Sequence, residues 1–218
     1  MGYFVGLDLG QSADYTALAV VQSVKEWDTR SEAKPGKWKT FLHLRHLERY
    51  PLRTPYTDVA NGVAALMRSE TLNGYEYDPS SGRVAKPRVE LIVDKTGVGV
   101  AVTDLLKARG LRFTAITITG GERVTRPRGA YNVPKLDLVA ALEVPFHTET
   151  LKVAEGLELW GVLREELQNF RRKVNAKTAH ASFEHWRETD HDDLVLAAAL
   201  ACWGATARRG QRALRVIR

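Results

Sequence analysis

Four aspartates stand at the ends of, or inside, apolar segments of this sequence. Asp8 interrupts one apolar run, Asp94 closes another, and a third run is preceded by the pair Asp192 and Asp193. Carboxylates a few ångströms apart raise one another's pKa, and burial adds a desolvation cost. If the fold brings these side chains together, the cluster needs a cation.

The cation best suited to such a set is Mg²⁺ or Mn²⁺, because these ions prefer hard oxygen ligands. The sequence has no histidine pair at zinc spacing, and its single cysteine, Cys202, excludes a zinc knuckle. Two such ions about 4 Å apart can activate a water and stabilise the leaving oxygen in phosphodiester hydrolysis. We therefore expect a site for two Mg²⁺ or Mn²⁺ ions.

Each acidic residue also has a structural interpretation. Asp94 and either Asp192 or Asp193 could cap the helices that follow them. Asp14, in the segment "SADYT", suits a turn, and His191 could either orient a water or lie exposed beside a helix start. Asp8 is the exception, since a carboxylate inside a strand has no capping role.

The elements that must position these residues follow from the hydrophobic pattern. Three strands joined by short connections predict an antiparallel meander, and further strands alternate with helices, the last of them apolar on nearly every face. A Gly, Pro and Ser-rich segment at 73–88 predicts a loop. The expected strands are 3–10, 16–24, 37–50, 89–94 and 112–119, and the expected helices are 54–70, 97–110, 134–144, 155–173 and 191–209.

This order predicts an α/β fold with a central mixed sheet of five or more strands flanked by helices, in one domain over residues 1–218. If the first and fourth strands are parallel neighbours, Asp8 and Asp94 project side by side. A final helix packed across that point brings Asp192 within reach of both.

Composition fits a protein that handles a polyanion. The 218 residues are 44% hydrophobic, enough for a substantial core, and carry a net charge of +6. No basic-then-apolar leader and no apolar run near the roughly 18 residues of a membrane span occurs, so we expect a cytoplasmic protein without a membrane partner. Basic residues concentrate at 122–129, at 170–173 and in the C-terminal tail, either as DNA contacts or as ordinary surface charges.

Four motifs, in this order, carry a resemblance: "GLDLGQSADYTALAVV", "VELIVDKTGVGVAVTDLL", "VPKLDLVAAL" and "HDDLVLAAALACW". Together they resemble the C-terminal nuclease domain of phage large terminase subunits, which has the RNase H-like fold and is related to RuvC-type resolvases. The resemblance extends over nearly the whole chain.

The resemblance implies that Asp8, Asp94 and Asp192 or Asp193 bind the catalytic metals, with Asp192 favoured as the direct ligand. Asp14 matches a position that can add an acidic contact. Lys135 matches a basic position facing phosphate, and the other candidate DNA contacts are Arg123, Arg126, Arg128, Arg171 and Arg172.

The implied function is cleavage of double-stranded DNA, with little sequence specificity, during viral genome packaging in the infected host cell. The implied partners are a packaging ATPase domain, a terminase small subunit and a portal. The sequence departs from the family's full-length proteins in one respect: no G-x-x-x-x-G-K-[ST] motif occurs, so this chain is expected not to be the motor. It is either an excised nuclease domain or a separate nuclease.

Three other interpretations stay open. A Holliday-junction resolvase of RuvC type would use the same metal chemistry on branched DNA. "GLDLGQS" also resembles the first phosphate loop of actin-like ATPases, although those need two lobes and this chain is long enough for one. A DNA-binding or assembly module without catalysis would have no reason to keep mutually repelling carboxylates.

Overall fold

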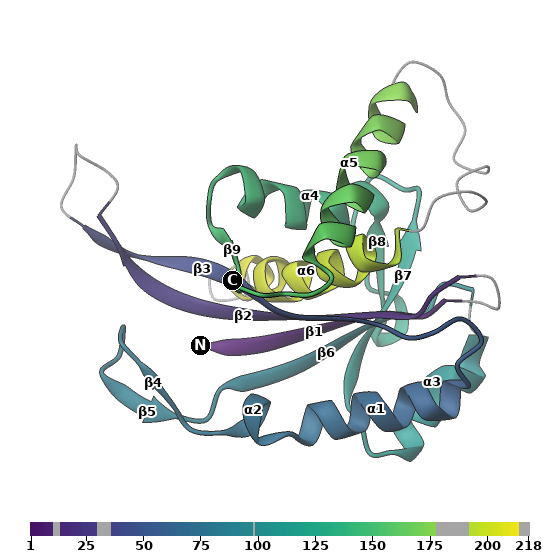
Figure 1. The fold of residues 1–218 in the computed structure, drawn as a ribbon, viewed down its shortest axis with the longest axis horizontal. Helices are drawn as coiled ribbons and strands as arrows, with labels where there is room; N and C mark the ends of the chain where they lie inside the picture. The colour runs from purple at the N-terminus through teal and green to yellow at the C-terminus, as the bar shows by residue number, and fades with distance from the viewer. Residues whose placement is uncertain (11–13, 30–35, 98, 178–191, 214–218) are drawn as a thin grey trace.

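The computed structural model describes residues 1–10, 14–29, 36–97, 99–177 and 192–213 as a mixed α/β structure (Figure 1). The large sheet consists of β1 (Gly2–Asp8), β2 (Ala17–Asp28), β3 (Lys37–Arg49), β6 (Arg88–Asp94), β7 (Phe113–Thr119), β8 (Tyr131–Pro134) and β9 (Leu151–Val153). A separate hairpin is formed by β4 (Glu76–Asp78) and β5 (Arg83–Ala85). The helices are α1 (Tyr56–Arg68), α2 (Glu70–Asn73), α3 (Gly99–Ala108), α4 (Lys135–His147), α5 (Trp160–Lys177) and α6 (Asp193–Ala213).

The order of the seven strands is β8-β7-β6-β1-β2-β3-β9. Strands β1, β2 and β3 form the expected antiparallel meander. On its other side β1 pairs in parallel with β6, and β6, β7 and β8 continue in parallel. The prediction of a mixed sheet with the first strand beside the strand that ends at Asp94 is therefore confirmed.

Three details of the sequence prediction are wrong. The segment predicted as a loop at 73–88 contains the end of α2, the β4–β5 hairpin and the first residue of β6, and its two three-residue strands have no buried side chain. Strands β8 and β9 were not predicted, because four and three residues are too few to show a period. Strand β1 ends at Asp8, so this carboxylate lies at the strand end and not in its middle.

Helices cover both faces of the sheet: α4, α5 and α6 lie on one side, and α1, α2 and α3 on the other (Figure 1). Every residue of β1 is buried, as expected for a strand covered on both faces. Its side chains alternate, with Phe4 in the core under α6 and Val5 and Leu7 in the core under α1 and α3. Asp8, two residues beyond Gly6 and four beyond Phe4, therefore belongs to the face that α6 covers.

Helix α6 packs directly onto β1 at a glycine. A Cβ atom built on Gly6 would lie 2.0 Å from the carbonyl oxygen of Ala197 and 2.7 Å from the amide nitrogen of Ala201. Further along, Gly204 faces Phe4 of the same strand. The helix thus runs antiparallel to β1, so its N-terminal end lies over the C-terminal end of the strand.

The sequence of α6 suits this contact. Alanines at 197–199 and 201 favour the helix and keep its sheet-facing side narrow, and residues 194–205 are all buried. Cys202 is fully buried here, and burial raises the pKa of its thiol to about 12. None of the helices in the described ranges combines the length and apolar character needed to cross a bilayer.

Candidate metal centre

Two carboxylates meet at the C-terminal ends of adjacent parallel strands. The β1–β6 register pairs Leu7 with Val93, which places Asp8 and Asp94 next to each other at the following position. Both side chains are buried, with 7% and 6% of their surface exposed. Carboxyl ends of parallel strands are the usual edge for a site in an α/β sheet.

The N-terminus of α6 adds a third buried carboxylate. Asp193 is the first residue of the helix and is 5% exposed, whereas Asp192 just before it is partly exposed. Their proximity to Asp8 is evident from the pKa of Asp8, which desolvation raises well above its ordinary value, with further increases from the charges of Asp94, Asp193 and Asp192. The charges of the other three aspartates singled out in the sequence therefore all act on Asp8.

The pKa of Asp193 is raised as well. Burial raises its pKa to about 7; the Arg49 guanidinium counteracts this, and the charges of Asp192 and Asp14 add to it. A carboxyl group whose pKa is raised in the folded protein stabilises the fold at low pH, where it is neutral, and this contribution is lost as the pH rises through the folded pKa.

A pH dependence of metal-free stability follows. In the presence of EDTA, the free energy of unfolding of the native chain minus that of Asp193→Asn should fall by about 1–3 kcal/mol from pH 5 to pH 8, since each pKa unit corresponds to about 1.4 kcal/mol. Urea titrations at each pH measure the difference. Asp104→Asn is the control, because Asp104 is in an exposed ion pair with Lys107 on α3. The free energy of unfolding of the native chain minus that of Asp104→Asn should not change with pH. A native-minus-variant difference that does not change with pH would contradict a raised pKa at Asp193.

A threonine orients Asp94. The Asp94 Oδ1 atom accepts hydrogen bonds from the Thr96 backbone amide at 2.8 Å and from the Thr96 hydroxyl. The same hydroxyl accepts a hydrogen bond from the Ile118 amide of β7 at 2.8 Å. The Asp94 Oδ1 atom is therefore tied through Thr96 to the neighbouring strand β7.

Lys135 at the start of α4 lies at the same edge. Its Nζ is 2.9 Å from Asp192 Oδ2 and 5.2 Å from the centroid of the buried Phe170 ring, and its charge lowers the pKa of Asp8. The basic residue that the resemblance assigns to phosphate thus lies beside the acidic cluster. Asp192, which the sequence favours as the direct ligand, is the aspartate that pairs with this lysine.

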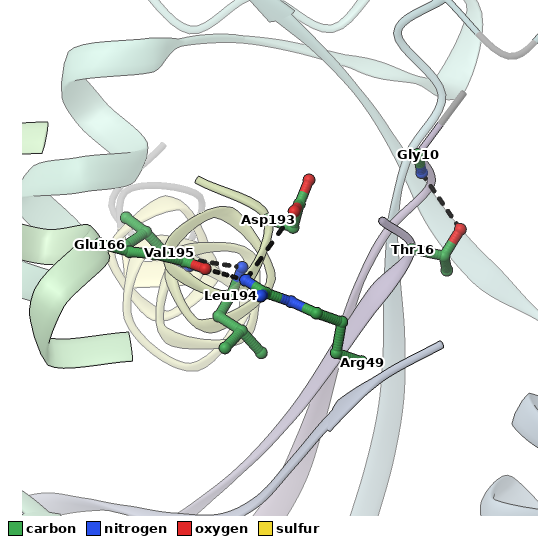
Figure 2. Close-up of polar contacts among 7 residues, drawn as sticks. All are labelled: Gly10, Thr16, Arg49, Glu166, Asp193, Leu194 and Val195. Atoms are coloured by element: carbon green, nitrogen blue, oxygen red, sulfur yellow. Dashed lines mark hydrogen bonds and ion pairs between the residues drawn. The ribbon is translucent and has the colours of Figure 1, made fainter. Parts of the chain in front are cut away.

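An arginine and a glutamate lie on the other side of Asp193 (Figure 2). Arg49 ends β3 and makes a direct ion pair with Glu166 of α5, while its Nη2 is 3.9 Å from Asp193 Oδ2. The second oxygen of Glu166 accepts hydrogen bonds from the amides of Leu194 and Val195, at 3.1 and 3.2 Å. Glu166 therefore caps the N-terminus of α6.

Sequence reasoning missed both residues, although a signal for one exists. Glu166 is three residues after Leu163 and four before Phe170, on the face of α5 that packs into the core, and it is 6% exposed. A charged residue at helical spacing among apolar ones is seldom buried without a partner. No such signal marks Arg49, because it is the last residue of a strand in which polar and apolar residues are mixed.

The connection between β1 and β2 is tied down at its two ends. The Gly10 amide donates to the Thr16 hydroxyl at 3.2 Å, as Figure 2 shows, and the Tyr56 hydroxyl donates to the Gly10 carbonyl at 2.6 Å. Asp14 within this connection is exposed, and it acts on Asp193 through its charge. It therefore lies near the site without being buried in it.

The other predicted contacts are dispersed or fall outside the described structure. Arg123 and Arg126 are exposed in the segment before β8, and the Arg126 guanidinium lies 4.8 Å from the centroid of the Tyr131 ring. Arg171 and Arg172 belong to α5 and Arg128 to a short 3₁₀ turn at Pro127–Gly129, but their side chains lie outside the described part. His191 also lies outside the described residues.

The side chains of the acidic cluster are of the chemical type that binds a hard cation. Asp8, Asp94 and Asp193 offer only carboxylate oxygens, and a divalent ion would relieve the repulsion that raises the pKa of Asp8. Among the described residues, however, no three His, Cys, Asp or Glu side chains already stand in an arrangement that holds a metal ion. Binding would require the carboxylates to close around it.

Comparison with solved structures identifies the type of fold. No protein-family model and no curated protein matches this sequence. Among solved structures, the chain is similar to the large terminase nuclease from the thermophilic phage G20c, with 17% identity and a TM-score of 0.52 over 93% of this chain and 81% of that one. It is also similar to a human cytomegalovirus terminase nuclease domain, Mn-soaked and inhibitor-bound, with 16% identity and a TM-score of 0.53 over 97% and 86% of the two chains. The chain has the RNase H-like fold of terminase nuclease domains, as its motifs predicted.

Proposed function

We propose that this chain is a Mg²⁺- or Mn²⁺-dependent endonuclease that cleaves double-stranded DNA during viral genome packaging. The observation that carries the proposal is the buried acidic cluster of Asp8, Asp94 and Asp193 at one edge of a terminase nuclease fold. Solved relatives of this fold are named as terminase nucleases, and one of them was soaked with Mn, which supports both the reaction and the metal.

Each residue of the cluster has a role in this proposal. Asp8, Asp94 and Asp193 hold the ions, and Asp192 and Asp14 add negative charge at the rim. When bound, two divalent ions supply an activated water and stabilise the charge on the departing oxygen. The sequence favours Asp192 as the direct ligand; the deeper burial of Asp193 leads us to propose Asp193 in that role.

Basic residues would hold the DNA backbone. Lys135 is at the rim of the cluster, where a phosphate could replace Asp192 as its partner. Exposed Arg123 and Arg126 extend the basic surface, and Arg128, Arg171 and Arg172 stay candidates from the sequence. Contacts of this kind are to phosphate and carry no sequence information, which agrees with cleavage of low specificity. A packaging ATPase, a small subunit and a portal are the proposed partners in the infected cell.

Plasmid cleavage in the presence of defined metals tests the function. Supercoiled plasmid should be nicked and linearised with Mn²⁺ or Mg²⁺ at a rate at least about 100-fold above that in EDTA, because the ions supply the reaction's charge stabilisation. Gel electrophoresis over time measures both products, and Ca²⁺ serves as an oxygen-binding control ion. If no divalent ion supports cleavage and calorimetry detects no Mn²⁺ binding, the fold serves as a DNA-binding or assembly module instead.

A further inference from the structure

The N-terminal end of α6 has two positive partners close to Asp193. One is the Arg49 guanidinium, 3.9 Å from Asp193 Oδ2. The other is the helix end itself, whose first amides lack partners within the helix and carry the positive end of its dipole. Both already act on the Asp193 carboxylate, so a cation that binds there has to compete with them.

Glu166 engages both of them. Its Oε1 pairs directly with Arg49, and its Oε2 accepts hydrogen bonds from the Leu194 and Val195 amides, at 3.1 and 3.2 Å. Figure 2 shows the Arg49 guanidinium between Glu166 and Asp193, at the end of α6 that carries Leu194 and Val195. The capping role that the sequence allows for Asp192 or Asp193 is thus filled, at these two amides, by a residue of a different helix.

Arg49 is held in this position from several directions. Its guanidinium lies 4.8 Å from the centroid of the Tyr15 ring, and the group is mostly buried. Its Nε atom is buried and has no hydrogen-bond partner within the described ranges. The arginine therefore depends on Glu166 as its direct anionic partner, and Asp193 is the next acceptor available to it.

We propose that Glu166 is a positioning residue that holds Arg49 through their direct ion pair, so that a divalent cation can displace the guanidinium from its longer contact with Asp193. This inference rests on the proposed function, since it concerns the same cluster. Without the Glu166 charge, the guanidinium moves onto Asp193 and takes the place of the cation. Residues that orient ligands in this way typically change metal affinity by about 10- to 100-fold.

Calorimetric titration of Mn²⁺ into four folded proteins tests the proposal. The native chain is compared with Glu166→Gln, with Arg49→Gln and with the double variant, and circular dichroism confirms that each is folded. Glu166→Gln should weaken Mn²⁺ binding by about 10- to 100-fold, whereas Arg49→Gln alone should keep it within about threefold. The double variant should recover most of the lost affinity, because the competing cation is gone. Glu165→Gln, an exposed neighbour on α5, is the matched control for the change in charge.

The outcomes separate the two proposals. If Glu166 merely stabilises the fold, the double variant binds Mn²⁺ no better than Glu166→Gln, and Arg49→Gln is weakened as well. Either result would overturn the positioning role while leaving the nuclease intact. If Glu166→Gln does not fold, the Mn²⁺ affinity of Arg49→Gln still distinguishes the two roles. An affinity close to that of the native chain supports the positioning role, and a weakened affinity overturns it. If the native chain itself binds no Mn²⁺, the proposed function falls and the role of Glu166 with it.

Discussion

Asp8→Asn is expected to lower plasmid cleavage in Mn²⁺ by about 100-fold or more, the largest effect on activity of any single substitution in this chain. Asp8 is the centre of the cluster: it and Asp94 directly follow the register pair of Leu7 with Val93, and the charges of Asp94, Asp193 and Asp192 all raise its pKa. An amide at this position removes the negative charge and leaves the volume almost unchanged. Initial rates of nicking at equal folded concentration measure the loss.

The same assay distinguishes the two adjacent aspartates of α6. Asp193→Asn should lose activity to a similar degree, because its carboxylate is buried against Asp8, while Asp192→Asn should lose less. Asp104→Asn on α3, which removes an exposed charge far along the chain, should retain full activity. Retained cleavage in Asp8→Asn would show that this cluster is not the catalytic site.

Gly6→Ala should destabilise the protein by about 3 kcal/mol or more, which is large for the addition of one methyl group. The new Cβ would lie 2.0 Å from the Ala197 carbonyl oxygen and 2.7 Å from the Ala201 amide nitrogen. Both are backbone atoms of α6, so no side chain can rotate away, and the helix must shift from the sheet. Urea denaturation measures the change in the free energy of unfolding.

Gly120→Ala is the matched control, since a Cβ there meets nothing within 4 Å, and it should change stability by less than about 0.5 kcal/mol. A shift of α6 also moves Asp193 relative to Asp8, so the folded fraction of Gly6→Ala should bind Mn²⁺ more weakly than the native chain. Equal stability of Gly6→Ala and Gly120→Ala would contradict the close packing of α6 on β1.

The main features of the fold are readable in the sequence because they involve long, strongly apolar segments. Strands β2 and β3 and the buried α6 each extend over more than ten residues with a clear pattern, and Asp8 is conspicuous in the short apolar run of β1. The β4–β5 hairpin and strands β8 and β9 gave no pattern, since three or four residues with mixed burial resemble any loop.

The site could be predicted in outline only. The meeting of Asp8 with Asp94 was predicted on the condition that their strands are parallel neighbours, and the pairing of β1 with β6 shows that they are. The choice between Asp192 and Asp193 depends on about 100° of helix rotation, which a sequence pattern does not fix for two adjacent residues at a helix start. Arg49 and Glu166 are 117 residues apart, and only the packing of α5 against the end of β3 brings them together.

The reactivity of Cys202 reports how often α6 leaves its place on the sheet. The thiol lies on the buried helix, fully shielded, with its pKa raised to about 12, and it is the chain's one cysteine. A thiol reagent can reach it only while α6 is detached from the elements that cover it, so the labelling rate measures how often α6 detaches under native conditions. Because the same helix carries Asp193, each event that exposes the sulfur also dismantles the acidic cluster. The lifetime of the candidate site can thus be read from one sulfur atom, without DNA and without turnover.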